Sequence, residues 1–237
     1  MSTSRAQTAG GPELRYELPG AAVLFTDRSH GSFALPADAA DGTLARAVRE
    51  RALGLTRTAA LVARGRQVHG STVTRIASGE IAEGEGAHAN GPADGQATSV
   101  EGLAVMVVSA DCPPVAVAGA GAVAMLHCGW RGLAAGVVEE GVRAVRELAA
   151  PGPLSAVIGP GAGPCCYEVG PEVHEALGVE REDTRIDLAS VALSRLAAAG
   201  VGDVRLVQTC TICDPRFYSH RREGARAGRQ AGIAWLT

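Results

Sequence analysis

The chain has 237 residues and a formal net charge of −3 at pH 7, and all 22 of its basic residues are arginine. This nearly neutral balance, without a basic block or a long apolar run, argues against nucleic acid and against a membrane as partners. The absence of lysine excludes a Walker A phosphate loop and a pyridoxal phosphate Schiff base, because both require that residue.

The N-terminal part, residues 1–19, is expected to be a disordered tail, because Met1–Gly11 is rich in Ser, Thr and Gly. The remainder, residues 20–237, is expected to form one domain, since nothing between its ends resembles a linker. With no secretory leader in the sequence, we expect a cytoplasmic protein.

Apolar patterning predicts three elements in the first part of the domain: a strand at Ala21–Phe25, a helix at Thr43–Leu53 and a strand around Thr58–Arg64. His69 follows in GRQVHG, at a strand end or turn, where a lone histidine beside glycine is more often a surface residue than a ligand. Ser78–Thr98 is expected to be mostly loop, and Asp94 before a glycine is typical of a turn.

Two short apolar runs, rich in β-branched residues and bounded by Gly or Pro, predict buried strands at Leu103–Cys112 and Ala122–His127. Each run ends in a side chain that can bind a metal, Cys112 in the first and His127 in the second. Because side chains alternate along a strand, His127 shares a face with Met125. Cys112 and His127 can therefore meet at a common rim.

A helix is predicted at Arg131–Ala149, where apolar residues recur at helical spacing. Its first turn begins in a Gly-Trp-Arg-Gly corner, and the free N–H groups and positive dipole end of a helix start favour an anion. Arg131 adds a guanidinium that can hold two oxygens of a phosphate or a carboxylate. The simpler alternative for this region is a buried thiol, a hydrogen-bonded core histidine and an arginine paired with a carboxylate.

The second half continues with a strand at Leu154–Gly159, a helix from Asp187 to about Ala199, and strands at Asp203–Gln208 and Gly232–Leu236. A Gly- and Pro-rich loop carries Cys165 and Cys166, and a later segment carries Cys210 and Cys213. Adjacent cysteines do not easily close on one ion, and a lone Cys-x-x-Cys pair lacks a second pair. We therefore expect buried structural thiols here rather than a zinc or redox site.

The segment CTICDPRFYSHRREG brings aromatic residues and arginines together near the end of the chain. Phe217 and Tyr218 could stack a base while Arg221 or Arg222 holds an anion. The alternative is an edge strand whose arginines are solvated. The residues alone leave both interpretations open.

Six long motifs occur in order: RQVHG, ADGQAT, SADCPPV, HCGWRGLAAGV, GPGAGPCCYEVG and CTICDPRFYSHRREGARAGRQ. Together they resemble the YfiH family, also called laccase-domain or peptidoglycan-editing-factor proteins and viewed as multifunctional purine nucleoside enzymes. The resemblance covers about residues 20–236. It implies an α/β (α+β) fold, a single domain with β-sheets flanked by helices, and a metal site whose pattern falls on His69, Cys112 and His127.

The family resemblance implies a zinc enzyme that acts on small molecules. The implied reactions are the phosphorolysis of adenosine, inosine, guanosine and S-methyl-5'-thioadenosine to base and ribose 1-phosphate, and the deamination of adenosine to inosine. Zinc held by two imidazoles and a thiolate keeps an open position for catalysis. Arg131 is the best candidate for phosphate, and Asp111 or Asp94 is a candidate proton carrier.

Two other functions remain open. One is a copper polyphenol oxidase, since two His and one Cys near Met125 match a blue-copper set and Cu²⁺ competes well for such ligands. The chain has only six His and no His-x-His pair, which disfavours a multicopper cluster. The other is an amidase that edits peptidoglycan precursors with the same zinc site. The sequence leaves the oligomeric state open between monomer and homodimer.

One segment departs from the family pattern. Where the family has GGVS, SLNLG and GDD, this chain reads DRSHGSFALPADAADG, with Ala34 in place of the asparagine. Nucleoside or phosphate contacts from this segment are therefore in doubt. Arg49 or Arg51 stands where the family has an arginine in the next helix, and the sequence does not choose between them.

Overall fold

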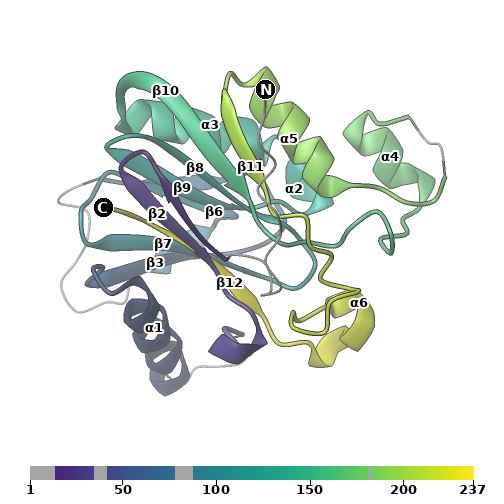
Figure 1. The fold of residues 1–237 in the computed structure, drawn as a ribbon, viewed down its shortest axis with the longest axis horizontal. Coiled ribbons are helices and arrows are strands. Elements are labelled where there is room, and N and C mark those ends of the chain that lie inside the picture. Colours follow the sequence, from purple (N-terminus) through teal and green to yellow (C-terminus); the bar gives the residue numbers. More distant parts are fainter. Residues whose placement is uncertain (1–13, 35–41, 78–87, 181–182) are drawn as a thin grey trace, which may run out of the picture.

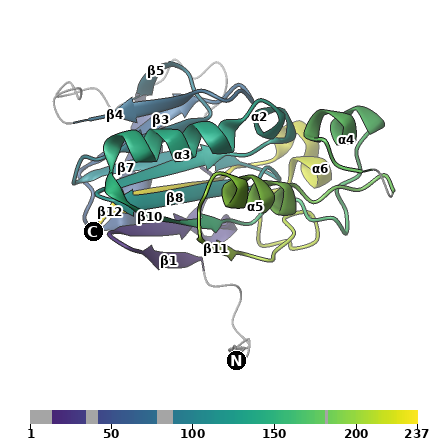
Figure 2. The ribbon, with the colours of Figure 1, turned by 90° about the horizontal axis from the view of Figure 1, so that it is seen from above.

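Two mixed β-sheets pack face to face, and helices cover their outer faces (Figures 1 and 2). The structure is a computed structural model that describes residues 14–34, 42–77, 88–180 and 183–237. The predicted α/β fold with helices flanking the sheets is confirmed. None of the helices in these ranges is long and apolar enough to cross a membrane.

Within the described ranges, each sheet has six strands. The first sheet has the order β1 (Arg15–Leu18), β2 (Ala21–Phe25), β12 (Gln230–Leu236), β7 (Leu103–Ser109), β3 (Leu61–Arg66) and β5 (His88–Pro92). The second sheet has the order β11 (Asp203–Leu206), β10 (Ala150–Ile158), β8 (Pro114–Ala120), β9 (Ala122–His127), β6 (Gly95–Thr98) and β4 (Val73–Ile76).

The helices lie on opposite sides of this sandwich. α1 (Gly42–Thr56) covers the first sheet, and α3 (Val137–Leu148) and α5 (Leu188–Ala198) cover the second (Figure 1). The short helices are α2 (Trp130–Ala134), α4 (Pro171–Leu177) and α6 (His220–Glu223), and the 3₁₀ turns are η1 (Arg28–His30) and η2 (Gly224–Arg226).

The central strands are buried on both faces, which explains their continuous apolar sequences. In β9, Val123 and Met125 point into the core between the sheets, whereas Ala124 and Leu126 point toward the helices. The same alternation places His127 on the Met125 face at the end of the strand, as predicted from the sequence. The candidate metal ligand of this strand is therefore its last residue, where the apolar sequence stops.

Several expected boundaries differ from the structure. β1 lies at Arg15–Leu18, inside the expected tail 1–19, because it pairs antiparallel with β2; the Met1–Gly11 part of that prediction lies outside the described residues. Ser78–Thr98 is not mostly loop where it is described, since β5 and β6 lie within it. β6 was missed because its small and polar residues carry no apolar alternation, although all four are buried.

The helix predicted at Arg131–Ala149 is broken into two. Gly136, at φ 89°, adopts a left-handed conformation that ends α2 and starts α3 in a new direction. The apolar spacing continues through this break, so the sequence pattern did not reveal it. The prediction of a cap at Asp187 is confirmed, because its carboxylate accepts hydrogen bonds from the N–H groups of Ala189 and Ser190.

The first prediction concerns the contact between α3 and β9. A Cβ at Gly141 would lie 2.4 to 3.0 Å from three side-chain carbons of the buried Leu126, whereas a Cβ at Gly54 in α1 would meet nothing within 4 Å. Gly141→Ala should therefore destabilise the protein by about 1–3 kcal/mol through overpacking. Gly54→Ala should stabilise it by up to about 1 kcal/mol through helix propensity. Urea denaturation of both variants measures the difference, and equal effects would contradict the packing described.

Candidate metal centre

Three candidate ligands from three segments meet at one end of the sandwich. His69 follows β3, Cys112 follows β7, and His127 is the last residue of β9. The metal-binding atoms of the three side chains all lie within 4.8 Å of one another. The two imidazole rings are 4.9 Å apart between centroids and nearly perpendicular. The structure thus brings together the three residues that the sequence motifs singled out.

Asp94 holds two of these ligands in place. Its Oδ1 accepts hydrogen bonds from Nδ1 of His127 at 2.8 Å and from the backbone N–H of His69 at 2.9 Å. Its Oδ2 accepts from the N–H groups of Val68 and Gly70 at 2.9 and 2.8 Å. Because a carboxylate only accepts, Nδ1 of His127 carries the proton and Nε2 is left for a metal.

Asp94 lies at the bend between β5 and β6, as its place before a glycine suggested, but it is also a fully buried positioning residue, which the sequence-based interpretation as a simple turn residue missed. Burial by itself raises the pKa of Asp94. The hydrogen bonds from His127 and from the backbone N–H groups of Val68 and Gly70 outweigh burial and lower that pKa. The carboxylate stays ionised, which favours an imidazole with its proton on Nδ1.

The backbone beside the ligands is strained. His69 has φ 61° and Asp111 has φ 92°, values that residues with a side chain rarely adopt. Such conformations cost about 1–3 kcal/mol each and persist where surrounding contacts fix them. At His69 those contacts are the three N–H bonds to Asp94. The left-handed backbone of His69 directs its imidazole toward the other two candidate ligands.

Asp111, the residue before Cys112, fixes the backbone next to that cysteine. Its Oδ1 accepts a hydrogen bond from the Thr211 hydroxyl at 2.7 Å, and its Oδ2 accepts from the Ser219 hydroxyl and the Arg221 N–H. Both oxygens are thus engaged with the C-terminal segment. The proposal that Asp111 or Asp94 carries a proton is not supported, because both carboxylates are occupied by fixed donors.

The thiol of Cys112 and the imidazole of His127 favour each other's charged forms. Burial alone raises the pKa of Cys112, but the His127 charge and hydrogen bonds from His127 and His69 lower it to about 6. Burial alone lowers the pKa of His127, but the Cys112 thiolate and Asp94 raise it to about 9. The site therefore holds a thiolate near neutral pH, which is the form that binds a metal.

Gly129 lies against all three ligands. A Cβ at this position would be 3.0 Å from Cδ2 of His69 and 3.1 Å from Sγ of Cys112, with Cε1 of His127 at 3.8 Å. Its φ of −68° is ordinary, so the need for glycine here is steric rather than conformational. This explains the glycine in the HCGWRG motif.

Arg131 lies on the surface next to this centre. Its guanidinium is 4.2 Å from the centroid of the Trp130 ring, and no ion pair joins it to a carboxylate in the described part of the chain. α2 has only five residues, so the expected dipole of a long helix is lacking at this point. Of the two parts of the predicted anion site, the helix start and Arg131, only the exposed guanidinium of Arg131 remains.

Tyr167 is a residue of the site that sequence reasoning missed. Burial and the Cys112 thiolate raise its pKa, while the charges of Arg221 and Arg131 act in the opposite direction. The guanidinium of Arg221 stacks on its ring at 5.0 Å and donates a hydrogen bond to the Glu168 carbonyl. Tyr167 lies in the motif GPGAGPCCYEVG, which was the available signal.

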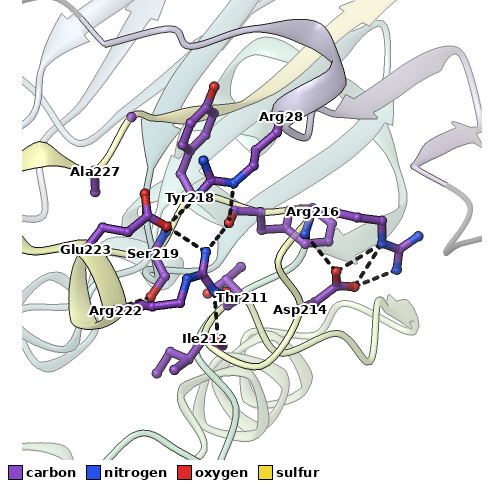
Figure 3. Close-up of polar contacts among 12 residues, drawn as sticks. Arg28, Thr211, Ile212, Asp214, Arg216, Tyr218, Ser219, Arg222, Glu223 and Ala227 are labelled. Atoms are coloured by element: carbon purple, nitrogen blue, oxygen red, sulfur yellow. Dashed lines mark hydrogen bonds and ion pairs between the residues drawn. The ribbon is translucent and has the colours of Figure 1, made fainter.

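The proposed base-stacking pair is not formed. Phe217 is fully buried, and the Tyr218 ring carries the guanidinium of Arg28 at 4.4 Å. Arg222 donates hydrogen bonds to the carbonyls of Thr211, Ile212 and Phe217 (Figure 3). Arg222 therefore holds the C-terminal segment together, and of the two arginines only Arg221 reaches the Tyr167 ring. The solvated edge strand proposed as the alternative is also not observed, since Ser219–Glu223 forms a capped helical turn.

The altered N-terminal segment is partly described. The guanidinium of Arg51 donates a hydrogen bond to the Ser32 carbonyl and lies 5.5 Å from the centroid of the Phe33 ring. Ser32, Phe33 and Leu35 are the residues of the family motif that this chain retains in outline, and Leu35 lies outside the described residues. Arg51 is thus the arginine that packs against that motif. Residues 35–41, where the motif continues, lie outside the described residues.

A second prediction concerns Asp94→Asn. Both oxygens of Asp94 accept hydrogen bonds, so in either orientation the amide NH₂ of asparagine would place a donor against a donor. At least one of these hydrogen bonds would be lost, and with it the orientation of His127 or of the turn at His69. We expect metal affinity to fall by about 10- to 100-fold, as for other groups that orient metal ligands. Competition with a chromophoric chelator measures it, with Asp203→Asn at the exposed start of β11 as the matched control. Unchanged affinity would show that Asp94 only stabilises the turn.

A third prediction concerns the metal-free protein. Since the pKa of Cys112 is lowered to about 6, its alkylation by iodoacetamide should rise as the pH passes through about 6 and then level off. In His127→Ala the rise should move up toward the ordinary value of 9.0. Peptide mass spectrometry follows Cys112 separately from the other cysteines. A midpoint that stays near 9.0 in the unsubstituted protein would contradict the thiolate–imidazolium pair.

Comparison with known proteins identifies the family of the chain. A profile of the family described as multi-copper polyphenol oxidoreductase laccase matches residues 25–237. A purine nucleoside phosphorylase of Xylella fastidiosa (strain Temecula1) is 40% identical over 190 residues, covering 72% of this chain and 70% of that one. Purine nucleoside phosphorylase YfiH of Escherichia coli is 35% identical over 184 residues, covering 72% of each.

Solved structures show the same fold. YlmD from Geobacillus stearothermophilus superposes with a TM-score of 0.77 at 28% identity and covers 98% of both chains. The YfiH protein of Bacillus licheniformis gives a TM-score of 0.77 at 24% identity, covering 92% of this chain and 93% of that one. The match to the profile and the identity to these relatives show that the chain belongs to the YfiH-like laccase-domain family.

Proposed function

We propose that this protein is a zinc-dependent purine nucleoside enzyme. Its proposed reactions are the phosphorolysis of adenosine, inosine, guanosine and S-methyl-5'-thioadenosine to base and ribose 1-phosphate, and the deamination of adenosine to inosine. The observation that carries the proposal is the group His69, Cys112 and His127, oriented by Asp94. The names of the relatives, which are purine nucleoside phosphorylases, support the nucleoside class.

The donor set fits zinc. Two imidazoles and one thiolate supply the N and S ligands that zinc prefers, and three protein ligands leave the fourth position of a catalytic zinc to water or substrate. When bound, zinc acts as a Lewis acid and lowers the pKa of a coordinated water toward about 7. A carboxylate on the second nitrogen of a histidine ligand, as Asp94 provides for His127, is frequent around such ions.

The surrounding residues fit a nucleoside and an anion. Arg131 presents an exposed guanidinium beside the centre, and a guanidinium binds phosphate in a fixed, two-pronged geometry. Tyr167 and Arg221 form a stacked aromatic–cation pair at the same rim, a surface on which a purine or ribose can pack. The proposed partners are thus small molecules, in the cytoplasm, with the enzyme acting as a monomer or homodimer.

Copper oxidation is the second candidate, and the description of the matching family favours it. A single centre with two His and one Cys can bind copper, since copper exceeds zinc in affinity for N and S ligands. The sulfur of Met125, however, lies 2.9 Å from where a Cβ of Gly232 would stand, inside the core between the sheets. With six histidines in the whole chain, the further copper ions of a multicopper oxidase lack ligands.

A fourth prediction tests the nucleoside function with purified, zinc-loaded protein. Inosine with phosphate should give hypoxanthine and ribose 1-phosphate, and adenosine without phosphate should give inosine. The release of hypoxanthine from inosine should rise with the phosphate concentration and saturate, whereas the release of ammonia from adenosine should not change with phosphate. Chromatography and an ammonia assay measure the products. Turnover of a phenol or of a muramoyl-peptide precursor without any purine product would replace this function by oxidation or by peptidoglycan editing.

Arg131→Ala separates the phosphate step from metal binding in the same assay. Loss of one charged hydrogen bond of about 1.5–3 kcal/mol lowers kcat/KM for phosphorolysis by about 10- to 100-fold. Zinc content and deamination should stay close to those of the unsubstituted enzyme. Arg205→Ala, at an exposed position on β11, is the matched control. Loss of zinc in Arg131→Ala would show that this arginine has a structural role instead.

A further inference from the structure

Four cysteines outside the first centre gather at one place on the surface. The sulfurs of Cys165, Cys166, Cys210 and Cys213 all lie within 4.8 Å of one another. Sγ of Cys213 is 3.3 Å from that of Cys165 and 2.8 Å from that of Cys166. The expectation of separate, buried structural thiols was therefore wrong: the two pairs meet, and Cys165 and Cys213 are exposed.

The backbone holds the two cysteine loops together. Gly161 and Cys210 form an isolated parallel bridge, and the Thr211 N–H donates to the Gly161 carbonyl at 2.9 Å. A Cβ at Gly163 would lie 3.0 Å from Cβ of Cys210, so only glycine lets the loops approach this closely. Backbone contacts between the two loops therefore bring the four cysteines together.

The sulfur of Cys210 accepts several backbone hydrogen bonds. The Gly163 N–H donates to it at 3.2 Å, and the N–H groups of Ile212 and Cys213 point to it from within the Cys-x-x-Cys turn. Donors of this kind stabilise a thiolate. A turn that directs its own N–H groups at its first cysteine stabilises the thiolate form that binds a metal. A neutral thiol in an apolar core does not need such donors.

We propose that these four cysteines bind a second zinc ion as a structural tetrathiolate site. Four thiolates at about 2.3 Å from a tetrahedral zinc stand about 3.8 Å apart, which the observed cluster reaches with small shifts of its sulfurs. Zinc replaces four thiol protons, which pass to solvent, and no electron is transferred. All four cysteines are free thiols in the structure, which is the state from which a metal site forms.

The site joins loops that border the first centre without contributing a ligand to it. Cys166 directly precedes Tyr167, and the hydroxyl of Thr211, inside the Cys-x-x-Cys turn, holds Asp111 beside Cys112. Arg222 donates to the carbonyls of Thr211 and Ile212 in the same turn (Figure 3). The second zinc would fix the Tyr167 and Arg221 rim and the backbone of Cys112. The site is independent of which substrate the enzyme uses.

The fifth prediction concerns zinc counted by elemental analysis in full-length protein purified under reducing conditions. The protein should hold about two zinc ions per chain, and both Cys210→Ser/Cys213→Ser and Cys112→Ser/His127→Ala should hold about one. The first variant should lower Tm and raise KM more than it lowers kcat. Equal zinc in the unsubstituted protein and in Cys210→Ser/Cys213→Ser overturns the proposal, whatever the total number of ions.

A second measurement uses Cys112→Ser/His127→Ala, which leaves the cysteine cluster untouched. Loaded with Co²⁺ it should show the strong thiolate charge-transfer absorption of a tetrathiolate site, and adding Cys165→Ser should weaken it. With zinc bound, Cys165 and Cys213 should resist iodoacetamide until a chelator is added. An absent charge-transfer band, or an intact mass showing a disulfide in place of the second zinc, contradicts the proposal even if other variants fail to fold.

Discussion

One buried carboxylate, Asp94, organises the candidate metal centre. It has no exposed surface, yet its two oxygens accept four hydrogen bonds, three from the backbone of the QVHG turn and one from His127. Burial of a charge is unfavourable unless hydrogen bonds of this kind compensate it. The same bonds fix the strained backbone of His69 and the proton position of His127. Ligand geometry, protonation and turn conformation therefore depend on a single side chain.

The sequence predicted the central strands and brought out the three clustered candidate ligands because both leave local signals. β7 and β9 are continuous apolar runs, and the ligands stand at their ends in long motifs. Asp94 could not be recognised, because Asp before Gly is also the ordinary signature of a turn. The break at Gly136 was hidden for a similar reason, since apolar spacing continues through it and a single glycine is tolerated in a helix.

The cysteines show a different limit of sequence reasoning. Cys166 and Cys213 are 47 residues apart, and neither cysteine pair is a complete metal motif by itself. They meet because parallel pairing of β10 with β11 brings the loops after both strands to the same edge of the second sheet. Spacing within a segment says nothing about such a meeting. The arginines of the C-terminal segment were also ambiguous in the sequence. Only the fold shows that Arg222 bonds to carbonyls of its own segment, whereas Arg221 lies at the Tyr167 ring.

The origin of the three ligands in the two sheets has a consequence for folding. His69 and Cys112 follow strands of the first sheet, whereas His127 ends a strand of the second. An ion that binds all three can do so only when the sheets are docked, so its binding energy adds to the stability of the sandwich. At a free concentration 100 times its Kd this contribution is about 2.7 kcal/mol, a large share of the stability of an ordinary domain. The availability of metal would thus set the lifetime of the folded chain as well as its catalytic competence.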